Sequence, residues 1–206
     1  GDLSSGTELW AYVIATKRNI RNDNGNSGMW RTRDKGQTWE QVYSEPNDDA
    51  SEIELAARPT GDEVIVDPHP DRSGHVYYAH YSRGLLRNKL AGSETNPGKV
   101  RTEWESIAFD GFRVKHIAAE VSGETTVLWM VARLASGPAD APGALFRMEF
   151  TGSEGFYDQP ESEMRIHDGR VTTIRPNPGD PDSGFLLVDG ILHRYALGPD
   201  GYETTQ

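Results

Sequence analysis

The sequence predicts an all-β fold made of about four four-stranded antiparallel sheets. Three observations predict it. A motif of one glycine, apolar residues and an arginine recurs four times, each copy follows an apolar run of strand length, and turn-forming residues are spread along the whole chain. The 22 glycines and 12 prolines indicate many short elements separated by turns. No apolar spacing of three and four persists for three turns, so we do not expect a helical fold.

The recurring motif sets the length of the repeat. Its copies are Gly28–Arg31, Gly84–Arg87, Gly143–Arg147 and Gly190–Arg194. They recur about every 50 residues, which is the length of one β-propeller blade with generous loops. We therefore expect a β-propeller segment of about four antiparallel blades, at approximately 7–44, 62–108, 113–166 and 170–206, with the first blade incomplete.

Strands are expected at corresponding places in each repeat. The apolar run before each motif predicts a strand covered on both faces, at Leu9–Ala15, Val76–Tyr81, Thr126–Ala132 and Phe185–Val188. An earlier strand is expected at Glu63–Val66, Val114–Ala119 and Val171–Ile174. An outer strand with one solvent-exposed face is expected at Thr38–Val42, Glu103–Ile107, Glu163–Ile166 and Tyr202–Thr205.

Two proline-rich stretches resemble each other and are expected to be turns between the first and second strands. They are Asp67–Gly74 and Arg175–Gly184. Proline stops strand pairing, and Asp and Ser side chains bond the local backbone in turns.

The first repeat lacks its innermost strand, because Gly1–Gly6 has no strand character. An unpaired strand edge at Leu9–Ala15 is an aggregation hazard. We therefore expect the polypeptide to be a fragment whose missing strand comes from another chain or segment. The rival prediction is a four-bladed ring closed by this chain alone.

Composition restricts the partners. The net charge of −11, from 32 acidic and 21 basic residues, argues against nucleic-acid binding. The absence of cysteine excludes disulfides and thiolate chemistry. No run of eighteen apolar residues predicts a membrane span. The acidic balance fits the solvated surface of an exported protein, which is periplasmic, on the cell surface or secreted.

The stretch from Thr32 to Trp39 carries a second motif, in which Thr32, Asp34, Gly36, Thr38 and Trp39 are the defining residues. Asp34 can accept backbone N–H bonds across a turn while Gly36 takes a positive φ. Trp39 is expected to anchor the outer strand against a neighbouring layer.

This stretch matches the Asp-box, or BNR repeat, and the chain resembles the Asp-box β-propellers. That group includes sialidases, sortilin-type receptors, xyloglucan-degrading glycosidases and photosystem II assembly-factor propellers, and the chain is most similar to the sortilin and xyloglucanase branch. Only the first repeat has the intact motif; the second keeps Trp104 after an insertion at Leu90–Thr102. In the family the Asp-box is structural and lies away from the active face, so the resemblance implies a fold and no catalysis.

The resemblance implies that ligands meet the face formed by the second-to-third and fourth-to-first strand connections. The candidate ligand-binding residues there are His80, Tyr81, Arg83, Asp110, Arg113, His167, Asp168 and Arg170. Arginine can grip a carboxylate bidentately and an aromatic ring can stack on a sugar. In the alternative interpretation, the two Asp-Gly pairs only make tight turns and the arginines are solvated.

No catalytic residue can be assigned. The Arg-Ile-Pro signature of sialidases is absent, and the carboxylates that a two-carboxylate glycosidase would need are explained equally by turns; they are Asp23, Asp110, Asp168 and Asp189. Asp23, Asp48 and Asp49 are weak candidates for Ca²⁺, and no other cofactor is expected.

The favoured function is a non-catalytic binding or interaction module of an exported or cell-surface Asp-box propeller. It would be part of a larger propeller or complex, with a glycan or a protein as ligand. The first alternative is half of a glycoside hydrolase that acts on polysaccharide. The second is an assembly factor for a membrane complex.

Overall fold

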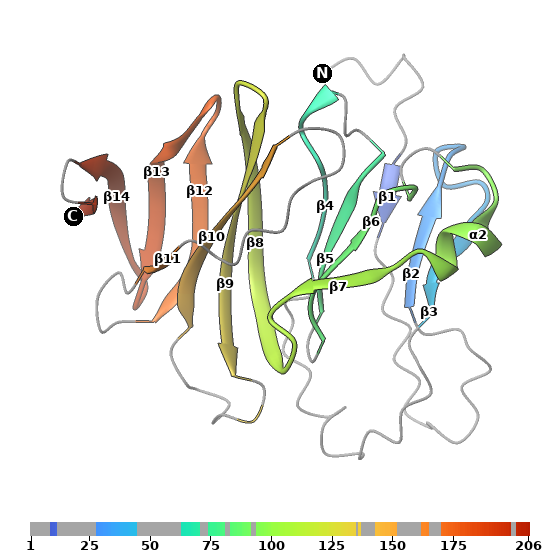
Figure 1. Ribbon diagram of the computed structural model, residues 1–206, viewed down its shortest axis with the longest axis horizontal. Helices are drawn as coiled ribbons and strands as arrows, with labels where there is room; N and C mark the ends of the chain where they lie inside the picture. Colours follow the sequence, from blue (N-terminus) through green and yellow to red (C-terminus); the bar gives the residue numbers. More distant parts are fainter. Residues whose placement is uncertain are drawn as a thin grey trace. The chain divides into compact units, whose positions relative to one another are not determined.

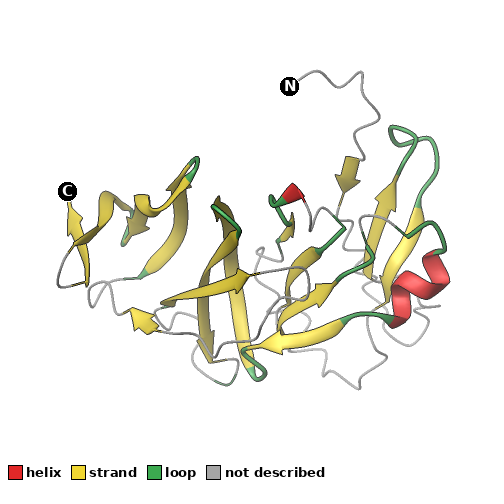
Figure 2. Cartoon of the chain, turned by 45° about the horizontal axis from the view of Figure 1, so that its top comes forward, coloured by secondary structure: helices red, strands yellow, loops and turns green. Residues whose placement is uncertain are grey.

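The computed structural model describes residues 9–11, 28–44, 63–70, 74–80, 83–91, 94–134, 136, 143–151, 162–164, 170–198 and 201–206. Within these residues the chain forms fifteen strands and one α-helix of six residues (Figures 1 and 2). The predicted all-β class is therefore confirmed.

The described strands form four antiparallel sheets, and in each the spatial order follows the chain order. Sheet 1 contains β1 (Leu9–Ala11), β2 (Gly28–Thr32) and β3 (Glu40–Ser44). Sheet 2 contains β4 (Val64–Val66), β5 (Val76–His80), β6 (Gly84–Asn88) and β7 (Glu105–Ala108). Sheet 3 contains β8 (Phe112–Ser122), β9 (Thr125–Leu134), β10 (Ala144–Thr151) and β11 (Ser162–Met164). Sheet 4 contains β12 (Val171–Asn177), β13 (Asp180–Val188), β14 (Ile191–Gly198) and β15 (Gly201–Thr205).

The chain divides into two compact units. Unit 1 consists of Gly1–Arg58 and Ser93–Trp104, and unit 2 of Pro59–Gly92 and Glu105–Gln206. Sheet 1 and the helix α2 (Pro97–Thr102) belong to unit 1, and sheets 2, 3 and 4 belong to unit 2. The insertion of the second repeat therefore packs with the sheet of the first repeat.

The position of Trp104 differs from the prediction, which assigned it to an outer strand of the second repeat. Strand β7 begins only at Glu105. The Trp104 indole N–H donates to the backbone O of Val42 at 2.6 Å, and its ring meets Tyr43 edge-on at 5.5 Å. A half-buried indole N–H needs an acceptor, and strand β3 of sheet 1 supplies it.

In unit 2, sheets 2, 3 and 4 pack face to face in succession (Figure 1). Strand β9 is at the centre, because its alternate side chains enter two apolar layers. Leu128 and Met130 face sheet 2, whereas Trp129 and Val131 face sheet 4. All four side chains are fully buried. This confirms for β9 the prediction that the apolar run is covered on both faces. The same prediction is wrong for Phe185–Val188, because Phe185 is 44% exposed on a face that no other described sheet covers.

The arginine of the glycine motif is a buried, paired charge. Arg31 and Arg87 have 0% of their surface exposed. Each lies directly opposite a glutamate on the next strand and bonds it: Arg31 with Glu40, and Arg87 with Glu105, at 3.0 and 2.8 Å. An unpaired buried guanidinium would be strongly destabilising. The repeat therefore conserves charge pairing between two strands in sheets 1 and 2.

The stretch Arg175–Gly184, expected to be a turn, is mostly strand. Only Pro178 and Gly179 form the turn, and Pro176 lies opposite Gly184 in the β12–β13 ladder. The ladder tolerates Pro176 because β12 is an edge strand and the register shifts directly after this proline. The prediction that proline stops strand pairing is therefore wrong at Pro176.

The residues of the Thr32–Trp39 motif form the turn between β2 and β3. The Asp34 carboxylate accepts the Thr38 N–H at 2.8 Å and the Thr38 hydroxyl at 2.5 Å, and the Thr32 hydroxyl accepts the Gly36 N–H at 2.8 Å. Gly36 has φ +89°, as predicted. Trp39 differs from the expectation: it is 40% exposed and its indole N–H donates to the Gly36 O at 3.1 Å. The tryptophan closes its own turn rather than packing into a layer of the described chain.

Replacing Asp34 by alanine is expected to destabilise the protein above pH 4 and to matter less as the pH falls. The Thr38 hydroxyl, which donates to the ionised carboxylate, is the main cause that lowers the pKa of Asp34 from 3.8 to about 2. A lowered pKa means that the stabilisation is complete above the ordinary value and is lost as the pH falls through about 2. The midpoint of thermal unfolding, measured for both proteins from neutral to acid pH, checks this.

Gln37→Ala is the matched control, since Gln37 is exposed in the same turn and bonds it through its backbone N–H. Equal melting midpoints for Asp34→Ala and Gln37→Ala at neutral pH would contradict the structural role of Asp34.

A polar network joins the first strands of sheets 2, 3 and 4. Both carboxylate oxygens of Glu63, directly before β4, lie within 2.7 Å of Nδ1 of His116 on β8. On the other side of the ring, Nε2 lies 2.9 Å from the backbone O of Ile174 and 2.7 Å from Nη1 of Arg175, both on β12. His116 is 3% exposed. The network therefore ties the edge strands of three stacked sheets together.

Glu63→Gln is expected to make the protein lose less of its folding stability when the pH falls from neutral to acid. Burial by itself raises the pKa of Glu63, but bonds from His116 and the Ile117 N–H, and the charges of His116 and Arg175, lower it below the ordinary 4.5. The carboxylate thus stabilises the fold above that value, and this contribution is lost on acidification. Urea unfolding midpoints between neutral and acid pH measure the effect, with the exposed Glu103→Gln as control. If the urea unfolding midpoint of Glu63→Gln fell with pH as steeply as that of the natural protein, the role of the carboxylate would be refuted.

Candidate anion-binding site

The structure describes five of the residues predicted to bind a ligand: His80, Arg83, Asp110, Arg113 and Arg170. Tyr81, His167 and Asp168 lie outside the described residues. The five divide into two groups. Three of them build turns, and two converge on a basic cluster.

His80 and Arg83 form the turn between β5 and β6. His80 is 1% exposed, and its Nδ1 accepts the Arg83 N–H at 3.0 Å. The turn continues at Gly84, which has φ +73° and where a Cβ would lie 2.3 Å from the backbone O of Ala108 and of Phe109. Only glycine fits there, so this first residue of the motif is required by the close approach of two turns.

Of the two Asp-Gly pairs in the alternative interpretation, Asp110–Gly111 is a tight turn, and Asp168–Gly169 lies outside the described residues; Asp189 also stands in a turn. Asp110 and Gly111 stand at an exposed turn where the Phe112 N–H donates to the Phe109 O at 2.8 Å. Asp189 has φ +48°, and its carboxylate accepts the Arg170 N–H at 3.0 Å. Both described candidates for glycoside hydrolysis therefore stand in turns, and the Asp189 carboxylate bonds the backbone. Asp23 and Asp168 lie outside the described residues.

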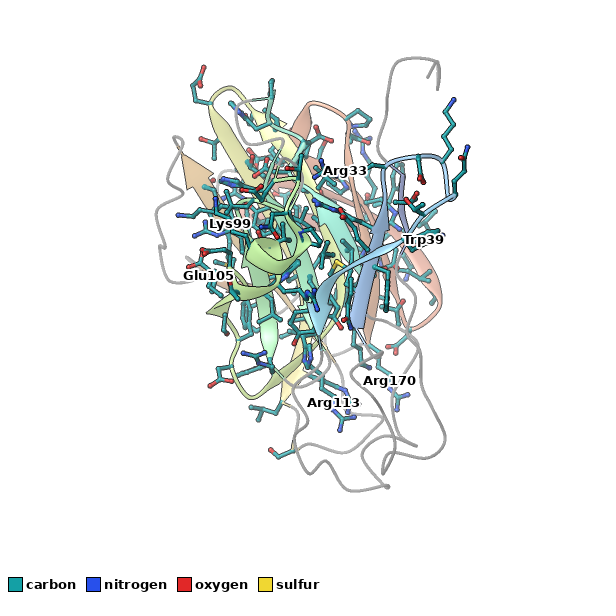
Figure 3. The ribbon with its side chains drawn as sticks, turned by 90° about the vertical axis from the view of Figure 1, so that its right-hand side faces the viewer. Arg33, Trp39, Lys99, Glu105, Arg113 and Arg170 are labelled. Atoms are coloured by element: carbon teal, nitrogen blue, oxygen red, sulfur yellow. The ribbon has the colours of Figure 1, made fainter. Side chains whose placement is uncertain are left out.

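Arg113 and Arg170, in contrast, come together with two basic residues that were not predicted. Arg113 lies directly opposite Arg133 in the β8–β9 ladder, and Lys115 follows two residues after Arg113. Arg170, directly before β12, is close enough for its charge to act on Lys115. Figure 3 shows Arg113 and Arg170 at the same end of the molecule. We call Arg113, Lys115, Arg133 and Arg170 the basic cluster.

A β-bulge places Lys115 in this cluster. Val114 pairs with Ala132, and His116 pairs with Val131, so Lys115 is the extra residue on β8. A bulge bends the strand and redirects side chains, and bulges are common at functional sites. The same irregularity keeps His116 in the network of the first strands while Lys115 remains beside the arginines.

The positive charges within the cluster act unfavourably on Lys115. Burial and then the positive charges of Arg133, Arg170 and Arg113 lower the pKa of Lys115 below its ordinary 10.5. Arg133 is 4% exposed. Nε of Arg113 is buried and has no hydrogen-bond partner among the described residues. An anion bound here would relieve the repulsion and accept several charge-assisted bonds.

Sequence reasoning missed Lys115 and Arg133 for an identifiable reason. Arg113 and Arg133 are brought together only by the register of two long strands. The available signal was positional: Arg133 follows a buried apolar run, and Arg113 and Lys115 occupy alternate positions at the start of the preceding strand.

No group of residues suited to a metal ion occurs in the described part of the chain. The weak Ca²⁺ candidates Asp23, Asp48 and Asp49 lie outside it. None of the helical residues that the structure describes forms a segment long and apolar enough to span a membrane.

Lys115→Met is expected to raise the melting temperature at low salt while weakening anion binding. A lysine whose pKa is lowered in the fold opposes folding while it is charged, so its contribution improves only as the pH rises toward deprotonation. Thermal unfolding at low and high salt measures the effect, which salt should reduce by screening. Lys89→Met, at a half-buried lysine outside the cluster, is the control. A lower melting temperature for Lys115→Met than for the control would contradict the repulsion.

No protein-family model matches the chain, and no curated protein matches it.

Proposed function

We propose that the chain is a non-catalytic binding module of an exported Asp-box-type β-propeller and that it holds an acidic ligand at the basic cluster. The single observation that carries the ligand class is Lys115, which lies among three arginines. The propeller interpretation is supported by the fourfold motif, by sheets whose strand order follows the chain, and by an Asp-box turn with its expected hydrogen bonds.

A carboxylate-bearing glycan suits this cluster best. Guanidinium groups bind carboxylates through two parallel hydrogen bonds, and a lysine adds a point charge. The chain as a whole is acidic, with a net charge of −11. Because the rest of such a protein repels anions, a local group of four basic side chains favours binding of an anion at this one site. The face is also the one on which the resemblance predicted a ligand.

The module is proposed to be non-catalytic because both described candidate carboxylates belong to turn residues. Hydrolysis of a glycosidic bond needs two carboxyl groups that flank it. Asp110 lies at the tip of a turn and Asp189 is bonded to the Arg170 N–H. The positive charges of the cluster would keep a neighbouring carboxyl group ionised, which disfavours the role of general acid.

Calorimetric titration with a short uronic-acid oligosaccharide tests the proposal, with a neutral oligosaccharide of the same length as the comparison. Binding of the acidic sugar should weaken at least about tenfold in the double variant Arg113→Ala, Arg133→Ala, because two charge-assisted contacts are lost. Binding should also weaken as the salt concentration rises.

The matched control is the double variant Lys89→Ala, Arg101→Ala, which removes the same charge outside the cluster. Equal affinity in the two double variants, or equal affinity for the neutral sugar, would contradict the acidic-ligand site. Release of reducing ends from the acidic sugar would contradict the non-catalytic assignment. Circular dichroism of each variant establishes that it folds.

A further inference from the structure

The amine of Lys115 has surroundings that differ from those of the other lysines. Its side chain is half-buried, and no carboxylate among the described residues pairs with it. Lys99, in contrast, pairs with Glu94 at 2.8 Å. An ion pair of that kind favours the protonated form of an amine, which has no lone pair. Lys115 lacks this restraint within the described part of the chain.

The register places Lys115 beside the three arginines of the basic cluster. Arg133 is two residues after Val131, which packs against sheet 4, so Arg133 faces the same way. Arg113 lies directly opposite Arg133, and cross-strand partners share a face of a sheet. Lys115 is two residues further along β8, at the bulge. Arg170, directly before β12 of sheet 4, lies at the same end of the molecule as Arg113 (Figure 3).

These surroundings favour the neutral form of the Lys115 amine. Burial, followed by the charges of Arg133, Arg170 and Arg113, lowers the pKa of Lys115 below its ordinary 10.5. The bond and the charge from Glu94 raise the pKa of Lys99 instead. Only a neutral amine can attack a carbonyl carbon, and a neighbouring cation is one way in which proteins activate a lysine for this reaction.

We propose that Lys115 forms an imine with the ketone carbon of a 2-oxo acid whose carboxylate is bound by the arginines of the basic cluster. The inference rests on the anion site of the proposed function and narrows its ligand to acids in which a ketone adjoins the carboxylate. Arginine binds a carboxylate through parallel hydrogen bonds. The buried Nε of Arg113 has no hydrogen-bond partner among the described residues, so it can donate to such a carboxylate. The ketone next to a carboxylate held there lies on the same face of sheet 3 as Lys115.

The reaction needs no oxidant and no cofactor. The Nζ lone pair of Lys115 forms a bond to the ketone carbon, and the electron pair of the C=O bond moves to the oxygen. Both amine protons are then transferred to that oxygen, which leaves as water. One amine and one ketone therefore give one imine and one water molecule, and addition of water reverses the reaction. The acid is held covalently but reversibly, as suits a binding module.

Reductive trapping of the imine tests the inference. The folded chain is incubated with pyruvate, as the probe for a 2-oxo acid, and with cyanoborohydride, which reduces an imine to a stable amine. Peptide mass mapping then measures the adduct at each lysine. Near neutral pH, Lys115 should react at least about tenfold faster than Lys89 or Lys99, because its amine is more often neutral and the arginines hold the acid beside it. The reaction should also reach its maximum at a lower pH at Lys115 than at Lys99, as the opposite directions of their pKa shifts require.

Lys89 and Lys99 are matched internal controls. Lys89 is half-buried outside the cluster, and Lys99 is paired with Glu94. If Lys115 reacted no faster than Lys89, the inference would be overturned.

Methyl pyruvate isolates the contribution of the arginines, because it keeps the ketone but carries no negative charge. The ratio of labelling at Lys115 to labelling at Lys89 should be about tenfold higher with pyruvate than with the methyl ester. Arg113→Gln should reduce this difference, and circular dichroism establishes that the variant folds. An equal ratio for the two probes in the natural protein would overturn the inference.

The calorimetric titration with the acidic sugar distinguishes failure of this inference from failure of the proposed function. If the acidic sugar binds at the basic cluster but Lys115 reacts no faster than Lys89, the imine is overturned and the anion site stands. If the sugar does not bind and Lys115 shows no preference for pyruvate over the methyl ester, both are overturned.

Discussion

In sheets 1 and 2 the fold depends on the burial of the arginine in the repeated motif. A guanidinium cannot lose its charge at any ordinary pH, so a buried one must find an acidic partner. Arg87 finds it in Glu105, directly opposite on the next strand, and its planar group lies near an aromatic ring of sheet 3. Arg147 reaches further, to Glu149 on its own strand and to Asp182 on sheet 4. One repeated residue thus specifies both the pairing within a sheet and the contact with the following sheet.

Stacking of the sheets has two consequences for the candidate site. It brings the first strands of three sheets close enough for Glu63, His116 and Arg175 to form one network. It also brings the start of β12 to the end of the β8–β9 ladder, where Arg170 joins Arg113, Lys115 and Arg133. The bulge at Lys115 separates these two environments, because it lies between the networked His116 and the basic cluster.

The basic cluster opposes local stability, because like charges lie together on partly buried side chains. Such conflicts are expected where a protein binds a ligand, and this conflict is the physical basis of the acidic ligand that we propose.

The sequence by itself determined the features that depend on residues close together in the chain. Apolar runs and the glycine motif located the strands of all four sheets, because each strand forms from a few consecutive residues of suitable period. The turn between β2 and β3 was equally predictable, since its donors and acceptors all lie between Thr32 and Trp39. The tight turns at Asp110 and Asp189 follow from the same local chemistry.

Only the tertiary structure decided which distant residues meet. Trp104 packs on sheet 1 although the residue after it begins a strand of sheet 2. Pro176 stays within a ladder because β12 is an edge strand, which depends on the order of strands in the sheet. Lys115 and Arg133 join the candidate site through a register and a bulge between two strands. A period of two assigns a side chain to a face, but the identity of its neighbour across the ladder depends on how the strands align.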